Sequence, residues 1–254
     1  NGVGIEDSPM LTLTNSDLQD SVGIFEDIGG NAEPNGAVVV VDGETYAPHK
    51  NETLEKWIYL ADMPVKIGEN GYWTLADAVK AVIESDSKTG TVTLTQDMVG
   101  TGIGLFNSKG AVGVNLTVDF GGHTYTCADP AVGSAGTETQ GFHLEKGNTV
   151  TLKNGTINVA ETSTKTKMLI QNYCDLTLSN LKLQGGDITQ YIVSCNYGNM
   201  VLNNVSIDGT YGNLVAVDLM HWIDMAAYKD KAPTMKIDNR SEDQINGSID
   251  VYCY

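Results

Sequence analysis

The residues of this chain that could take part in catalysis or ion binding are mostly carboxylates. Asp and Glu total 32 against 15 Lys and Arg, and Arg240 is the only arginine. Paired carboxylates act as acid and base in glycoside hydrolysis, and clustered ones hold calcium. No two Asp residues are adjacent, and Asp175, Asp187 and Asp208 are scattered along the sequence. No cofactor is therefore predicted; calcium binding stays open, without support from the spacing.

A dispersed polar site can still form if equivalent positions of a repeat stack on one another. Five polar residues each stand one position after a recurring apolar residue: Asp119, Lys153, Ser179, Asn203 and Asp238. If neighbouring repeats lie side by side, Asp119 faces Lys153. That pair is either part of a ligand-binding site or an ordinary surface ion pair, which contributes little stability. Asp119, Lys153, Asn203 and Asp238 are taken as candidate ligand-binding residues.

Three further candidates lie in the segment Leu219–Pro233. His221, Trp222 and Tyr228 carry side chains that are suited to lining a sugar site. The segment reads as a helix with apolar residues available for packing, so Trp222 instead packs this helix onto the scaffold in the alternative interpretation. Segments that leave a rigid scaffold are common places for binding residues.

The four cysteines do not indicate a metal or redox site. They stand at positions 127, 174, 195 and 253, and no two form a Cys-x-x-Cys pair. Such spacing is unlike that of zinc or dithiol motifs. We expect Cys174 and Cys195 to be buried free thiols, and the cysteines do not fix a cellular compartment.

The elements that would position these residues are visible as a repeat. Three similar phrases occur at Thr149–Ile157, Asp175–Leu183 and Asn199–Ile207, with spacings of about 26 and 24 residues. They align three leucines: Leu152, Leu178 and Leu202. Weaker copies extend the same column to Leu94, Val118 and Ile237. Two of the spacings between consecutive aligned residues, from Val118 to Leu152 and from Leu202 to Ile237, are about ten residues longer than the others. They predict a surface loop over His123–Gln140 and the helix over Leu219–Pro233.

Each copy reads as a short strand with one buried face, because apolar residues alternate with polar ones. A second apolar run precedes each copy, as in MLIQN and YIVSC, and a third follows it, as in Ser206–Ile207. Three short strands in about 24 residues form one coil of a solenoid, in which like side chains stack about 4.8 Å apart. An ordinary β-sandwich with coincidental spacing is the alternative.

Two positions after the aligned apolar residues stand four asparagines: Asn154, Asn180, Asn204 and Asn239. Asparagine tolerates left-handed backbone angles at a turn, and stacked amides can bond to one another. We expect an inward-facing structural ladder. Here the sequence resembles right-handed parallel β-helix proteins of the pectate-lyase-like kind, over about residues 71–254. The resemblance implies an all-β fold: a right-handed single-stranded parallel β-helix of about six coils, with an N-terminal capping helix and a small N-terminal extension.

The expected domain organisation follows from this fold. Residues 1–68 form an N-terminal extension or a small cap region, with strands at Met10–Thr14 and Ala37–Val41, a turn at Asp42-Gly43 and a short helix at Thr53–Leu60. Residues 69–254 form the β-helix, with a capping helix at 74–85 and coils at 90–254. Thr74 is its expected N-cap, with Asp77 three residues later. This entry into the coils resembles that of β-helix domains in large bacterial surface proteins.

The resemblance brings functional expectations. Catalytic β-helix families carry clustered Asp residues, a Gly-His-Gly segment or basic residues beside a calcium site, and this sequence lacks the clustered Asp and Gly-His-Gly motifs. The net charge of −17 argues against nucleic acid or an anionic membrane as partner. No apolar run approaches 18 residues, so no insertion into a membrane is expected.

We therefore expect a secreted or cell-surface bacterial module, without catalytic activity, for adhesion, glycan binding or spacing. Its partner would be a glycan or a protein of a host or cell surface, and its oligomeric state is open. A polysaccharide lyase or glycoside hydrolase acting along the outer solenoid face is the alternative.

Overall fold

The structure, a computed structural model, describes residues 10–13, 38–41, 44–51, 56–61, 63–208, 215–239 and 244–254. The chain divides into two compact units, Asn1–Met63 and Pro64–Tyr254. Each unit is described by itself.

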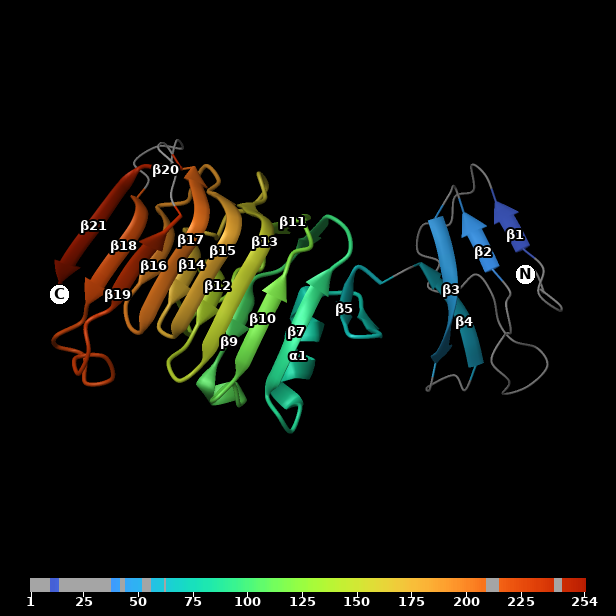
Figure 1. The fold of residues 1–254 in the computed structure, drawn as a ribbon, viewed down its shortest axis with the longest axis horizontal. Helices are drawn as coiled ribbons and strands as arrows, with labels where there is room; N and C mark the ends of the chain where they lie inside the picture. The colour runs from blue at the N-terminus through green and yellow to red at the C-terminus, as the bar shows by residue number, and fades with distance from the viewer. Residues whose placement is uncertain are drawn as a thin grey trace. The chain divides into compact units, whose positions relative to one another are not determined.

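The first unit contains one four-stranded sheet in the order β1-β2-β3-β4 (Figure 1). Its strands are β1 (Met10–Leu13), β2 (Val38–Val41), β3 (Glu44–Asn51) and β4 (Lys56–Ala61). β1 and β2 are parallel, and the other neighbours are antiparallel. The helix expected at Thr53–Leu60 is wrong, because β4 occupies most of that range and its Trp-Ile-Tyr run favours a strand. The Asp42-Gly43 turn lies outside the described residues.

The described residues of the second unit form two mostly parallel sheets and one α-helix, α1 (Leu75–Glu84). The strands of the larger sheet are β5 (Val65–Ile67), β6 (Asn70–Tyr72), β7 (Thr89–Leu94), β8 (Met98–Gly100), β10 (Asn115–Asp119), β11 (Thr124–Cys127), β13 (Thr149–Val159), β15 (Asp175–Gln184), β17 (Asn199–Asp208), β19 (Thr234–Asp238) and β20 (Ile245–Asn246). Those of the smaller sheet are β9 (Ile103–Leu105), β12 (Gln140–Leu144), β14 (Met168–Asn172), β16 (Tyr191–Cys195), β18 (Val215–His221) and β21 (Ser248–Cys253). A short 3₁₀ turn, Asn107–Lys109, follows β9.

The repeat stacks with the spacing that the sequence predicts. Leu152 pairs with Leu178, Leu178 with Leu202, and Leu202 with Ile237, on parallel strands that adjoin in space (Figure 1). The chain thus alternates between the two sheets, from β12 to β13 to β14 and onward. This mainly β arrangement with two parallel sheets is compatible with a parallel β-helix.

The first aligned strand differs from the expected register. Val92, and not Leu94, lies opposite Val118 on β10. Both Val92 and Leu94 are buried, so a shift of two residues keeps the same face of β7 toward the core. The period-two pattern alone does not distinguish these two registers.

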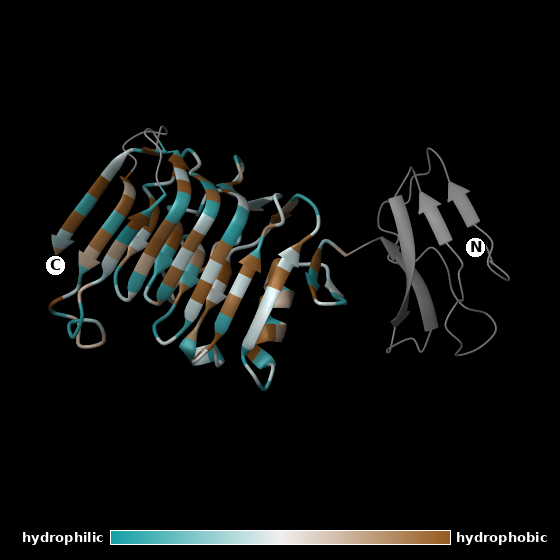
Figure 2. Ribbon diagram, in the orientation of Figure 1, coloured by the Kyte–Doolittle hydropathy of each residue, from teal (hydrophilic) through white to brown (hydrophobic). Residues whose placement is uncertain are grey.

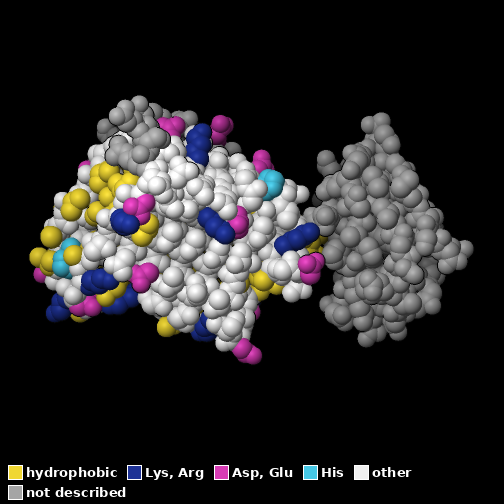
Figure 3. All heavy atoms as spheres, in the orientation of Figure 1, with side chains coloured by type: hydrophobic (Ala, Val, Ile, Leu, Met, Phe, Trp, Pro, Cys, Tyr) yellow, Lys and Arg dark blue, Asp and Glu magenta, His cyan; other side chains and the backbone are white. Residues whose placement is uncertain are grey.

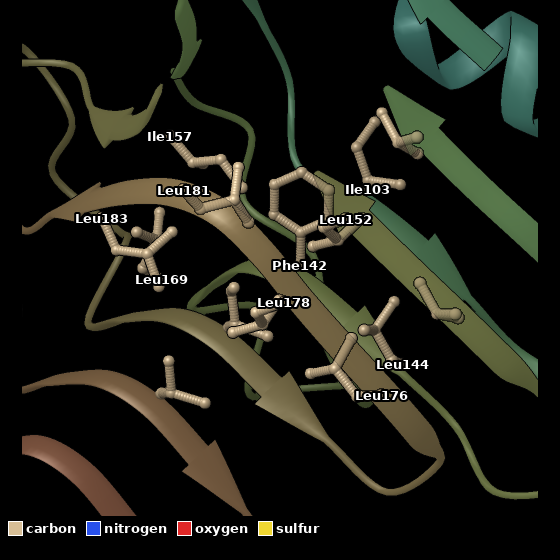
Figure 4. Close-up of a cluster of buried hydrophobic side chains, with 14 of the residues drawn as sticks. Ile103, Phe142, Leu144, Leu152, Ile157, Leu169, Leu176, Leu178, Leu181 and Leu183 are labelled. Carbon is tan, nitrogen blue, oxygen red and sulfur yellow. The ribbon is translucent and has the colours of Figure 1, made fainter. Parts of the chain in front are cut away.

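The core lies between the two sheets and is filled by the inward side chains of successive strands. Brown and teal bands alternate along these strands in Figure 2, as expected for strands with one buried face. Figure 4 shows Phe142 and Leu144 of β12 among Leu152, Leu176 and Leu178 of the facing strands. All five are at most 1 % exposed. At about 25 cal/mol per Å² of apolar surface, this burial is the main stabilising contribution.

The asparagine positions mark a bend within single strands. β13, β15 and β17 each combine the expected second and third strands of a coil, and Asn154, Asn180 and Asn204 stand at the bend with φ values of 59°, 51° and 53°. The Asn180 amide donates to Asn154 Oδ1 at 3.2 Å, and Asn204 donates to Asn180 Oδ1 at 2.9 Å. Asn239, also at positive φ, bonds instead to Asn203 Oδ1 at 2.7 Å.

These amides do not face inward as the sequence suggests. Asn180, Asn204 and Asn239 are exposed, and Asn154 is half-buried. The amides lie on the outer side of the bend, where Asn154 donates a hydrogen bond to the outward carboxylate of Asp119. Buried asparagines instead occur where the chain passes between the sheets, at Asn148, Asn172 and Asn196. Asn148 and Asn196 sit in connections before β13 and β17, and Asn172 is the last residue of β14, before β15; the repeat alignment did not single out these positions.

The expected capping helix is present as α1. The Thr74 hydroxyl accepts a hydrogen bond from the Asp77 amide at 3.0 Å and donates one to the Asp77 carboxylate at 2.7 Å. Leu75, Ala78, Val79 and Val82 form the buried face of the helix. Val82 packs on β7 at Gly90, where a Cβ would lie 2.8 Å from Val82 Cγ2. The β5–β6 hairpin also covers β7, because β5 pairs with it antiparallel.

The two segments that lengthen the repeat, His123–Gln140 and Leu219–Pro233, have different structures from those expected. The loop predicted over His123–Gln140 contains β11, which pairs with β13 and buries Tyr125 and Cys127. The helix predicted over Leu219–Pro233 is wrong. β18 continues to His221, and the residues after it form bends and turns. The apolar spacing there reflects separate anchoring contacts instead of one helical face.

Cys174 and Cys195 are buried free thiols, as is Cys127, while Cys253 is an exposed free thiol. Burial raises the pKa of the Cys195 thiol to about 11, so it stays protonated at neutral pH. Within the part of the chain that the structure describes, no helix is long and apolar enough to cross a membrane.

Candidate functional site

Four of the predicted site residues lie in one row on the outer face of the larger sheet. The row runs across β10, β13, β15, β17 and β19, and consecutive members are register partners: Asp119, Lys153, Ser179, Asn203 and Asp238. The residue before each of Lys153, Ser179 and Asn203 points into the core, so these side chains point outward. The structure thus brings Asp119, Lys153, Asn203 and Asp238 onto a common surface.

Asp119 and Lys153 face one another as the alignment predicts. Lys153 Nζ lies 3.2 Å from Asp119 Oδ2. Asp119 also accepts hydrogen bonds from the Gly121 amide at 3.0 Å and the Asn154 side chain at 3.1 Å. Burial by itself raises the pKa of Asp119, but the hydrogen bonds from Gly121, Asn154 and Lys153 outweigh it and lower that pKa. Asp119 is therefore a stable carboxylate, held in place as an acceptor.

The other end of the row is also hydrogen-bonded. Asn203 accepts from Asn239, and its own amide lies 3.5 Å from Ser179 Oγ. Asp238 pairs with Lys236 on its own strand, with a distance of 2.8 Å between Nζ and Oδ2. The ion pairs at the two ends leave a central part of hydroxyl and amide groups.

Two further outward rows lie parallel to the first. One consists of Asn115, Thr149, Asp175, Asn199 and Thr234. The other consists of Thr91, Thr117, Thr151, Thr177, Val201 and Lys236. We call the three rows together the outer polar face. Figure 3 shows a few separated charged side chains on a surface that is otherwise mostly uncharged.

Side chains within the rows bond along the stack. The Asn199 side chain donates to Asp175 Oδ1 at 2.9 Å, and the Thr234 hydroxyl donates to Asn199 Oδ1 at 2.9 Å. Because the parallel strands are about 4.8 Å apart, the rows repeat polar groups at a fixed interval. The outer polar face thus carries hydrogen-bonding groups at regular intervals.

His221, Trp222 and Tyr228 lie elsewhere. They stand at the end of β18, in the smaller sheet, and in the turns that follow. Trp222 makes an edge contact with Tyr254, with ring centroids 5.2 Å apart, and its Nε1 is buried without a hydrogen-bond partner among the described residues. His221 Nε2 is 3.3 Å from the Lys229 carbonyl. The structure does not join them to the outer polar face.

Tyr228 anchors the segment after β18 to neighbouring coils. Its ring stacks on Tyr173 with centroids 4.7 Å apart and lies 5.9 Å from Tyr197. Lys146 Nζ sits 4.1 Å from the centre of the Tyr197 ring and donates to the Ala227 carbonyl at 3.0 Å. These contacts occupy the aromatic faces with one another, so the cluster holds the segment in place.

Sequence reasoning missed a polar row on the smaller sheet, in which His143, Ser194 and Asp218 are buried. Its members are in register: His143, Gln171, Ser194, Asp218 and Asp250. The signal was present, because His143, Gln171, Ser194 and Asp218 recur at equivalent positions of the apolar runs that precede the aligned strands. These runs were taken as uniformly apolar, so the polar residue in each was not examined.

Asp218 is the most unusual member of this row. It is 2 % exposed, and its Oδ2 accepts from the Ser194 hydroxyl at 2.8 Å. Its Oδ1 is buried without a partner among the described residues. Burial raises the pKa of Asp218, hydrogen bonds from Ser194 and Tyr252 lower it, and the charge of Asp250 raises it, with a net increase. The row therefore contains a carboxyl that holds its proton to higher pH than usual.

The described residues include no group of three or more His, Cys, Asp or Glu side chains that is arranged to hold a metal ion. Comparison of this chain with protein-family models, with curated proteins and with solved structures finds no match.

Proposed function

We propose that this chain is a non-catalytic module of a secreted or cell-surface bacterial protein and that it binds an extended glycan along the outer polar face. In this proposal the fold is a right-handed single-stranded parallel β-helix of about six coils, of the pectate-lyase-like kind. The module serves in adhesion or as a spacer. The observation that supports it is the set of three in-register rows, which consist mostly of hydroxyl, amide and carboxylate groups and also include Lys153, Val201 and Lys236.

The ligand class follows from the chemistry of these rows. A glycan presents hydroxyl groups at regular intervals, and each hydroxyl can donate and accept a hydrogen bond. Thr151, Thr177 and Asn203 offer matching groups on adjacent strands. Sites built on strands hold their geometry better than sites on loops. A net charge of −17 repels acidic polymers, so a neutral glycan fits best.

The decisive experiment compares two arginine variants of the same strand type. Thr177→Arg places a large charged side chain in the middle of the outer polar face. Thr156→Arg places the same side chain on β13 beyond the bend at Asn154, away from that face. Binding to a panel of neutral glycans is measured for both proteins. Loss for Thr177→Arg with retention for Thr156→Arg is expected. Equal loss in both, or no bound glycan at all, contradicts the proposal, and capture of a surface protein alone would replace the glycan with a protein partner.

A polysaccharide lyase or glycoside hydrolase remains the second candidate because of Asp218. A carboxyl with a raised pKa next to a second carboxylate, Asp250, is what acid–base cleavage of a glycosidic bond requires. Against it, Asp218 Oδ1 is closed to solvent, so a substrate oxygen has no access to it. Assays for new reducing ends and unsaturated products separate the two candidates. Turnover that Asp218→Asn or Asp119→Asn abolishes would establish the enzyme.

A further inference from the structure

The last strand of the smaller sheet, β21, is held less firmly than the strands before it. It stands at the edge of the sheet, and among the described residues it pairs with β18 alone. Its inward residues Ile249 and Val251 are 38 % and 73 % exposed, whereas their register partners on β18, Val217 and Leu219, are buried. Burial of apolar surface therefore contributes little to the docking of β21, and its polar contacts matter more.

Asp218 lies at the junction between β18 and β21. It is level with Asp250 on β21, and on its other side it is level with Ser194 on β16. Register partners on parallel strands stand about 4.8 Å apart and point to the same face. The Ser194 hydroxyl donates to Asp218 Oδ2 at 2.8 Å. Asp218 is buried and Asp250 is half-buried, so one carboxyl is enclosed between a hydroxyl and a second carboxyl.

The second oxygen of Asp218 has nothing to bond. Its Oδ1 is closed to solvent and has no hydrogen-bond partner among the described residues. A buried carboxylate whose oxygens are not all paired is costly, because water no longer solvates its charge. Protonation removes this charge and supplies a donor at the point where two carboxyl groups stand level. The enclosed position therefore favours the neutral form of Asp218.

The groups that face Asp218 do not offset a negative charge on it. From β21 these are Asp250 and Tyr252. From β16 they are Ser194 and Cys195. Burial raises the pKa of Tyr252 to about 12 and that of the Cys195 thiol to about 11, so both are uncharged at neutral pH. No cationic side chain of the described residues contributes to the raised pKa of Asp218 or opposes it, and the charge of Asp250 adds to it.

We propose that β21 is an acid-strengthened latch, which docks on β18 most tightly when Asp218 carries a proton and loosens when Asp218 is ionised. When β21 moves away, Asp218 loses the like charge of Asp250 and gains water. Its pKa then falls toward the ordinary value near 4. Because the docked state has the raised pKa, the proton favours docking at acidic pH, and this contribution is lost as pH rises through the docked pKa. This inference is independent of the proposed glycan binding.

The test is amide hydrogen exchange of the full chain between about pH 4 and about pH 7, with each rate corrected for the intrinsic effect of pH. We expect the protection of the β21 amides to fall at least about threefold across this range. The amides of β16, in the middle of the same sheet, should keep their protection. Asp218→Asn preserves the shape of the side chain without its charge. In this variant β21 should be at least about threefold better protected than in the unaltered chain at pH 7, and its protection should be nearly constant with pH.

Two further variants keep Asp218 in place. Asp250→Asn removes the neighbouring like charge and should also raise the protection of β21 at pH 7. Asp187→Asn removes an exposed charge from the turn after β15 and should leave the pH dependence of β21 unchanged.

The proposal is overturned if β21 is protected equally at all pH values in the unaltered chain, or if its pH dependence persists in Asp218→Asn. Lower protection at pH 7 in Asp218→Asn would show that the ionised carboxylate holds the strand, which is the opposite of the proposed latch. Unchanged protection in Asp250→Asn, or equal effects of Asp250→Asn and Asp187→Asn, would likewise contradict it, because the net charge of the chain and not the paired carboxyl groups would then set the response.

Discussion

Asn180 combines two roles at one position, a left-handed backbone and a link in a chain of amides. Its φ is 51°, and it bonds to Asn154 on one side and to Asn204 on the other. Most residues with a Cβ avoid this region at a cost of about 1–2 kcal/mol, whereas Asn tolerates it and Gly adopts it freely. The recurrence of Asn at these bends is therefore explained by backbone geometry first and by the amide bonds second.

Substitution at Asn180 separates these two roles. Asn180→Ala and Asn180→Gly both remove the amide bonds, but only the alanine adds left-handed strain. We expect Asn180→Ala to lower the free energy of unfolding by about 2 kcal/mol and Asn180→Gly by less, measured by denaturant unfolding. Lys182→Ala, at an exposed position of the same strand, should change it by less than about 0.5 kcal/mol. Equal effects of alanine and glycine would show that backbone strain is not the cause.

Asp119 gives a pH dependence whose sign is fixed by its lowered pKa. The unfolded chain takes up a proton on Asp119 at a higher pH than the folded chain does, so this carboxylate stabilises the fold above its unfolded pKa near 4. That contribution is lost as pH falls through the folded pKa. We expect Asp119→Asn to be less stable than the unaltered chain by about 1 kcal/mol at pH 7.

The measurement is the free energy of unfolding of both proteins from about pH 7 to about pH 3. The difference between them should shrink as the solution becomes acidic. A difference that is constant with pH would mean that the hydrogen bonds of Asp119 do not depend on its charge.

The sequence was informative about residues that share a face and less so about residues that meet across turns. The facing of Asp119 and Lys153 follows from the alignment of repeats and is observed. That Asn158 and Asp187 line the same hollow was not foreseen, because it depends on how two turns fold back beside the strands. The burial of Asp218 was not foreseen either, because its segment was interpreted as an apolar run and the polar residue in it was not considered.

At the scale of elements, the regular repeats were predictable and the departures from them were not. β13, β15 and β17 follow directly from alternating apolar residues in three similar phrases. The segment after β18 has apolar residues at helical spacing but forms turns. Its side chains pack on separate partners, Trp222 on Tyr254 and Tyr228 on Tyr173, and such tertiary contacts override local helical preference.

The Tyr228 ring should hold the segment after β18 against the neighbouring coils. Removing its ring in Tyr228→Ala eliminates the stacking on Tyr173, which contributes about 0.5–1.5 kcal/mol beyond area burial. Because the segment is an excursion from the stack, we expect faster trypsin cleavage at Lys229 and Lys231 with little change in global unfolding. Tyr228→Phe keeps the ring and should resist trypsin like the unaltered chain. Unchanged cleavage in Tyr228→Ala would mean that the Lys146 contacts alone hold the segment.

The second unit as a whole is closed at one end of its stack and more open at the other. At the first coil, α1 and β5 cover β7. At the last, inward positions of β21 are exposed, with Ile249 at 38 % and Val251 at 73 %. Hydrophobic side chains gather over this end in Figure 3. In a stacked fold each coil is buried by its two neighbours, so burial falls at an end that has only one.

Because burial falls toward the last coil, a valine-to-alanine substitution should lower the free energy of unfolding much more in the middle of the stack than at this end. Val193 of β16 is 0 % exposed and Val251 of β21 is 73 % exposed, and both belong to the smaller sheet. Val193→Ala removes two buried carbons and leaves a cavity, which should lower the free energy of unfolding by about 2–3 kcal/mol. Val251→Ala should change it by less than about 0.5 kcal/mol. Denaturant unfolding of the two variants measures the difference.

Stability in stacked folds is carried by contacts between neighbouring coils. Comparable losses of stability in the two variants would therefore mean that another chain covers Val251 in solution. The loss in Val251→Ala would then depend on protein concentration.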